Sequence, residues 1–91
     1  MQEDPMAPGR AAIEKELQLQ AQTRGVAVSD ILWKANRSDD HVLDFKVNGR
    51  RESIIFSQEN VQDAPLPKGL DLIRSKVVHC LTITRAQGGG Q

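Results

Sequence analysis

Residues 41–56 read HVLDFKVNGRRESIIF, a pattern of two short strands joined by a turn. Apolar and polar side chains alternate from Leu43 to Val47, as they do in a strand that buries one face. Asn48 and Gly49 follow, and both residue types tolerate the positive φ angles of tight hairpin turns. Apolar residues return at 54–56. The sequence therefore predicts an antiparallel hairpin in the middle of the chain.

Two registers of this hairpin are compatible with the sequence. A two-residue loop would place Phe45 opposite Glu52, whereas a four-residue loop over 48–51 would place Phe45 opposite Ile54. Matching apolar residues across the two strands favours the four-residue loop.

Upstream of the hairpin, residues 11–24 contain neither Gly nor Pro and consist mostly of strong helix formers. Ile13, Leu17 and Ala21 recur every four residues, which places them on one stripe of a helix. Gly25 follows at the position where a left-handed residue commonly ends a helix. We expect a helix over this segment.

Residues 26–37 can be read in two ways. As a strand, the segment would place Ile31 and Trp33 on one face and Lys34 on the other. As a helix, it would begin at Ser29, and the chain would then resemble a helix-turn-helix or ribbon-helix-helix reader of DNA. The run of β-favouring residues at its start favours the strand.

Downstream of the hairpin, the sequence predicts a short helical turn over 57–63, capped by Ser57 and ended by Pro65. A second long helix follows. Its predicted apolar stripe consists of Leu66, Leu70, Ile73, Val77 and Leu81.

The order of these elements is α-β-β-β-α, which predicts a single small α+β domain. A three-stranded antiparallel sheet with two helices on one face would bury all the apolar stripes, and strands joined by short turns need no crossover. We expect the domain to span 11–85. Residues 1–10 are expected to form a disordered N-terminal tail, and the Gly-rich residues 86–91 a flexible C-terminal tail.

Composition argues against several classes of function. The twelve basic residues equal the twelve acidic ones, so the strong positive charge typical of nucleic-acid-binding proteins is missing. Cys80 is the single cysteine, which favours a reducing, cytoplasmic setting. The chain shows no signal peptide and no membrane-spanning run, so no membrane association is expected.

Few residues suggest metal binding or catalysis. Ser38, Asp39, Asp40 and His41 could supply metal ligands, but adjacent residues rarely converge on one ion, and a turn is the preferred interpretation. His79 and Cys80 are neighbours on a predicted helix and diverge too far to act as base and nucleophile. We therefore expect neither an enzyme nor a bound cofactor.

The order of elements, the helix end at Arg24 and Gly25, and His41 before a strand resemble the double-stranded-RNA-binding domain. The resemblance spans about residues 11–82 and implies RNA contacts through the first helix and a loop bearing a histidine. That family also carries a lysine cluster at the start of its last helix, where this chain has Lys68 alone.

The leading functional hypothesis is a small non-enzymatic binding or adaptor module. It would contact another protein, or itself as a dimer, through its sheet face or edge. The alternative is a nucleic-acid-binding module whose topology is similar to that of the double-stranded-RNA-binding domain. The candidate partner-binding residues for either reading are Trp33, Lys34, Arg37, Lys46, Arg50 and Arg51.

Overall fold

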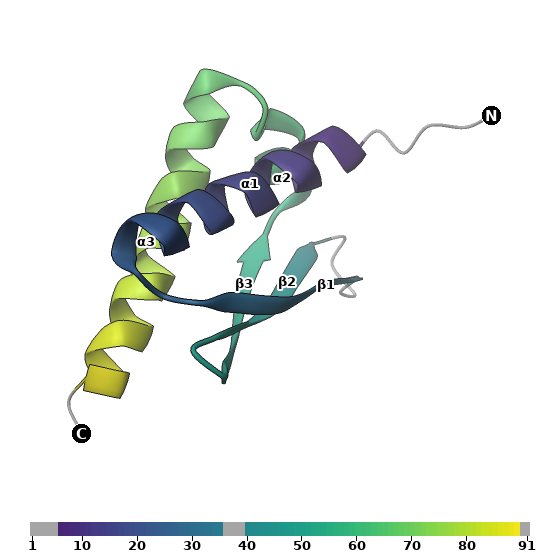
Figure 1. Ribbon diagram of the computed structural model, residues 1–91. Coiled ribbons are helices and arrows are strands. Elements are labelled where there is room, and N and C mark those ends of the chain that lie inside the picture. Colours follow the sequence, from purple (N-terminus) through teal and green to yellow (C-terminus); the bar gives the residue numbers. More distant parts are fainter. Residues whose placement is uncertain (1–5, 36–39, 90–91) are drawn as a thin grey trace.

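The computed structural model describes residues 6–35 and 40–89, and these form a small α+β domain. Three antiparallel strands in the order β1-β2-β3 make an open sheet, and the helices gather on one side of it (Figure 1). The elements in chain order are α1 (Ala7–Arg24), β1 (Val28–Ala35), β2 (His41–Val47), β3 (Arg50–Phe56), α2 (Gln58–Asp63) and α3 (Pro67–Gly89). The predicted fold class is confirmed.

Both long helices extend beyond their expected ends. α1 begins at Ala7, within the segment expected to be an N-terminal tail, and Met6 before it is buried. Pro8 suits this start because the first turn of a helix has no partners for its N–H groups. α3 continues to Gly89, past the expected boundary at residue 85.

The end of α1 is formed as predicted. Gly25 adopts the left-handed conformation, with φ of 68°, and its N–H donates to the Gln22 carbonyl. The predicted stripe of Ile13, Leu17 and Ala21 is buried against the rest of the core.

The strand interpretation of residues 28–35 is confirmed, and the helical alternative required by a helix-turn-helix reader is wrong. β1 pairs with β2 from Val28 to Ala35, with one irregularity between Ser29 and Leu32. Over this interval β1 contains one residue more than β2, which is a β-bulge.

The hairpin closes through a two-residue turn, so the preferred four-residue loop is wrong. Asn48 and Gly49 both have positive φ, of 51° and 85°, as a type I′ turn requires. Phe45 therefore lies opposite Glu52 rather than Ile54. The two registers differ by two residues, so both keep the same side chains facing inward, and the apolar pairing that favoured the longer loop did not decide the register.

Asn48 also ties this turn to β1. Its N–H donates to the Ala27 carbonyl at 2.8 Å, and its side-chain Oδ1 accepts from the Ala27 N–H at 2.9 Å. The tip of the β2–β3 hairpin is thereby attached to the start of β1.

The short helix α2 starts at the predicted cap. The Ser57 hydroxyl accepts from the Asn60 N–H, and the Asn60 side chain accepts from the Ser57 N–H, which completes a capping box. The backbones of α1 and α3 each approach the backbone of α2 so closely that glycine is required at the point of contact. A Cβ at Gly9 would lie 1.8 Å from the Val61 carbonyl oxygen, and one at Gly69 would lie 1.9 Å from that of Asp63.

The core lies between the helices and the inner face of the sheet. It contains Ile13 and Leu17 from α1, Leu43, Phe45 and Val47 from β2, Ile54 and Phe56 from β3, and Ile73, Val77 and Leu81 from α3. Leu66 does not join this stripe: it precedes α3 and is 56 % exposed, so its assignment to the helix core is wrong.

One carboxylate is buried where α1 meets α3. Glu16 accepts hydrogen bonds from the Gln20 amide at 2.7 Å and from Arg74 Nε at 3.2 Å. The buried charge is thus both paired and hydrogen-bonded, as a stable fold requires. None of the helices in the described ranges is both long and apolar enough to span a bilayer.

Candidate functional site

The outer face of the sheet, opposite the helices, gathers exposed side chains from all three strands. Strand register arranges them in three rows, each with one residue from β1, β2 and β3. The rows are Lys34, Val42 and Ile55; Leu32, Asp44 and Ser53; and Ser29, Lys46 and Arg51, with Asp30 of the bulge forming an ion pair with Lys46. Apolar and charged groups are therefore mixed on one uncovered surface, which we call the open face.

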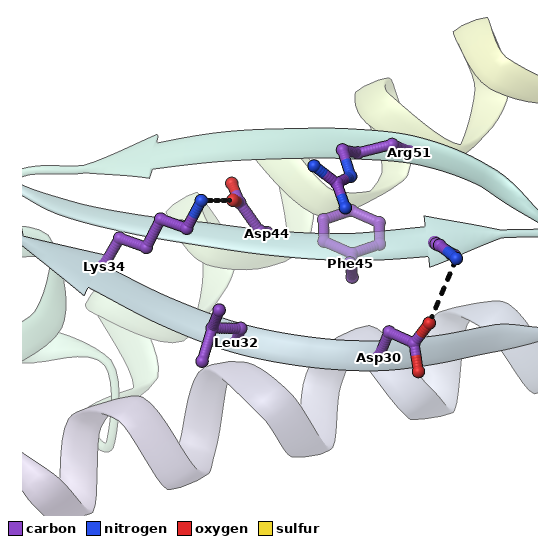
Figure 2. A pocket seen from close by; sticks show the side chains of 7 residues that line it. Asp30, Leu32, Lys34, Asp44, Phe45 and Arg51 are labelled. Atoms are coloured by element: carbon purple, nitrogen blue, oxygen red, sulfur yellow. Dashed lines mark ion pairs between the residues drawn. The ribbon is translucent and has the colours of Figure 1, made fainter.

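A shallow hollow of about 270 Å³ lies on the open face (Figure 2). Lys34, Lys46 and Arg51 bring three cations to it, and Asp30 and Asp44 bring two carboxylates. Leu32 supplies an apolar side chain between them, whereas the Phe45 side chain belongs to the core and is 1 % exposed.

Asp44 is the best connected group on this face. Its carboxylate lies 2.9 Å from Lys34 Nζ and accepts a hydrogen bond from the Ser53 hydroxyl at 2.7 Å. These contacts lower the pKa of Asp44, first through the hydrogen bond from Lys34 and then through that from Ser53. Asp44 therefore stays ionised and cancels the charge of Lys34.

The second ion pair on the open face joins β1 to β2. Lys46 Nζ lies 3.3 Å from the Asp30 carboxylate. Asp30 belongs to the β-bulge and has a φ of 55°, a left-handed conformation that Asp tolerates better than most residues. Arg51 completes the cluster, and among the described residues no carboxylate lies within 4 Å of it.

The structure separates the predicted site residues into two groups. Lys34, Lys46 and Arg51 meet on the open face, as a cluster of positive charge would require. Arg50 is exposed but lies opposite Val47, whose side chain is buried on the helix side, so it is not part of the cluster. Arg37, like Ser38 and Asp39 of the considered metal site, lies outside the described residues.

Trp33 does not belong to the open face either. Its indole N–H donates to the Glu14 carboxylate of α1 at 2.8 Å, and its ring lies 6.0 Å from that of Phe56. Trp33 is thus partly buried on the helix side of β1, and its hydrogen bond links β1 to α1.

Two exposed apolar residues of the open face were missed in the sequence. Leu32 is 55 % exposed and Ile55 is 52 % exposed. Alternation contains the signal for both: once Trp33 and Ile54 face the core, their neighbours Leu32 and Ile55 must point the other way. The pairing of Asp30 with Lys46 has no such local signal, because it depends on the bulge.

No metal-binding group of three or more suitable side chains occurs within residues 6–35 and 40–89. A scan against protein-family models and searches of curated proteins and solved structures found no match to this chain. Its function must therefore be argued from its own surface.

Proposed function

We propose that this domain is a non-enzymatic binding module that contacts a protein, either a different chain or a second copy, through its open sheet. One observation carries the proposal: the open face leaves Leu32 and Ile55 more than half exposed beside charged side chains. Exposed apolar groups with a polar surround are typical of surfaces that bind other proteins.

The charges of the open face favour a protein partner over nucleic acid. Phosphate binding requires cations that are free to replace counterions. Here Lys34 and Lys46 are each paired with a carboxylate, at 2.9 and 3.3 Å, and Arg51 is left as the free cation of the hollow. A partner with both apolar and charged groups complements this surface better than a uniform row of phosphates. The single cysteine is compatible with a cytoplasmic location.

The proposal can be tested by affinity capture from the native host. The tagged wild-type chain is compared with a variant carrying Leu32→Asp and Ile55→Asp, and with Leu72→Asp as the control. Leu72 has a similar exposure, 47 %, but lies on α3. Every sample is divided and treated with or without nuclease, and the captured proteins are identified by mass spectrometry.

We expect a protein that is captured by the wild type and by Leu72→Asp, that survives nuclease, and that is lost with the open-face variant. Capture that disappears with nuclease would favour the nucleic-acid-binding alternative. A protein retained equally by all three chains would show that the open face is not the contact surface.

A further inference from the structure

The two edges of the sheet differ in how they are covered. On β3, Lys76 of α3 donates to the Ile55 carbonyl at 2.9 Å and lies 5.5 Å from the centre of the Phe56 ring. On β1, no hydrogen bond from the described part of the chain reaches the outer edge. The unpaired edge of β1 is therefore the place where another strand can add to this sheet.

Hydrogen-bond alternation identifies the backbone groups that this edge offers. In a two-residue hairpin, the residues that flank the turn, Val47 and Arg50, form a hydrogen-bonded pair. Hydrogen-bonded and non-hydrogen-bonded pairs alternate along β2, so every second residue of β2 bonds to β1 instead of β3. The register of β1 then directs the backbone N–H and C=O groups of Leu32 and Lys34 toward β2. The backbone N–H and C=O groups of Trp33, between them, therefore face outward.

The side chains along the β1 edge are complementary to those of a second copy of β1 that runs in the opposite direction. On the open face β1 presents Asp30, Leu32 and Lys34 in that order, with Leu32 in the middle (Figure 2). If a second β1 runs antiparallel with Leu32 opposite Leu32, then Asp30 faces the partner's Lys34, and Lys34 faces the partner's Asp30. Each acid thus lies opposite a base, and the two copies of Leu32 lie opposite each other.

The same register also matches the helix side of β1. There Ile31 would lie opposite the partner's Trp33, and Trp33 opposite the partner's Ile31. Both side chains are only partly buried in the single chain and pack at the margin of its core. Pairing two copies would cover them, which adds apolar burial to the new backbone hydrogen bonds.

From these observations we propose that two copies of this chain associate through antiparallel β1 strands, with Leu32 on the two-fold axis. The product is a continuous six-stranded sheet, and the interface is isologous, as in most homodimers. Asp30 and Ile31 belong to the bulge between Ser29 and Leu32, so in this register Trp33 and Lys34 of each chain meet the bulged segment of the other, the contact is short and its formation depends on concentration. This inference rests on the proposed function and names its partner.

The test uses charge reversal of the full chain, with mass measured by sedimentation equilibrium over a range of concentrations. Lys34→Asp places two acids opposite each other at both ends of the interface, and Asp30→Lys places two bases there. Each change should weaken association roughly tenfold or more, because two pairs change from attraction to repulsion. Thermal unfolding of every variant checks that it still folds, since Lys fits the φ of Asp30 less well than Asp does.

Restoration is the decisive result. A chain carrying both Asp30→Lys and Lys34→Asp should dimerise again, because the reversed order of charges is again self-complementary. The two single variants, mixed together, should form a heterodimer that native mass spectrometry detects, although neither forms a homodimer. Arg51→Asp is the control, because it changes the charge of the same hollow from β3, a strand that takes no part in β1 pairing.

A mass of one chain at every concentration would overturn this dimer, as would a dimer that Lys34→Asp leaves unchanged. A dimer that Arg51→Asp weakens as strongly as Lys34→Asp would indicate packing through the open face and would also contradict the β1 register. These results do not decide the proposed function: a strictly monomeric chain that still captures a host protein through Leu32 and Ile55 would support a different partner.

Discussion

Asp44 shows how single side chains organise the open face. Its carboxylate connects all three strands, since it pairs with Lys34 of β1 and accepts from Ser53 of β3. Both contacts favour its ionised form, so its pKa is lower in the folded than in the unfolded chain. The native state therefore binds fewer protons at Asp44 than the unfolded state does. The stabilisation from Asp44 is complete above its ordinary pKa of 3.8 and is lost as the pH falls through the lower folded value.

We expect Lys34→Met to raise the pKa of Asp44 toward 3.8, because the hydrogen bond from Lys34 is the largest cause of its depression. The titration of the Asp44 carboxyl carbon can be followed by NMR. Lys68→Met removes a cation from an exposed position at the start of α3 and serves as the control. Equal shifts in both variants would mean that net charge, rather than the contact, sets this pKa.

At the scale of elements, the helices are positioned by close backbone approach as well as by apolar stripes. α1 passes so near α2 that Gly9 has no room for a side chain beside Val61. Helix propensity alone favours Ala over Gly by about 1 kcal/mol, so propensity and packing make opposite predictions at this position.

For Gly9→Ala we expect a loss of about 1–3 kcal/mol in the free energy of unfolding, because the backbone of α2 must shift to admit the methyl group. Urea denaturation measures the change. Gln18→Ala, at an exposed position of the same helix, should stay within about 0.5 kcal/mol of the wild type. A more stable Gly9→Ala protein would show that α1 and α2 do not make this contact.

At the scale of the whole molecule, one face of the sheet is buried and the other is open. Ile54 and Ile55 are adjacent in sequence, yet Ile54 is 8 % exposed and Ile55 is 52 % exposed. The pair therefore reports which side of the sheet the helices cover, and the same substitution at each position isolates the effect of burial.

Ile54→Ala should lower the free energy of unfolding by about 2–5 kcal/mol, because it removes buried methyl groups and leaves a cavity. Ile55→Ala should change it by less than about 1 kcal/mol, since its side chain already contacts water. Thermal or urea unfolding of the two variants gives the comparison. Equal losses at both positions would mean that something also covers the open face.

Features that depend on near neighbours in sequence could be predicted. Ile13, Leu17 and Ala21 predicted the buried stripe of α1. Gly25 predicted the end of α1, and Ser57 predicted the start of α2. These features could be predicted because periodicity and capping act over one or two helical turns. The position of the hairpin turn at Asn48 and Gly49 was equally clear, since few residue types accept positive φ.

Features that depend on contacts between distant segments could not be predicted. The hairpin register was misjudged, because both candidates kept the same inner face and the conformation of the turn decided between them. The hydrogen bond from the Trp33 indole N–H to Glu14 had no local signal, because it joins β1 to α1. Three of the cations predicted to bind a partner do meet, but only the tertiary structure shows that Asp44 and Asp30 neutralise two of them. Local sterics and apolar periodicity in the sequence predicted the two long helices, the hairpin and their order, and favoured a strand over 28–35 that the structure confirmed. The tertiary structure decided which face remained open and which charges paired, because those outcomes depend on how separate elements pack in space.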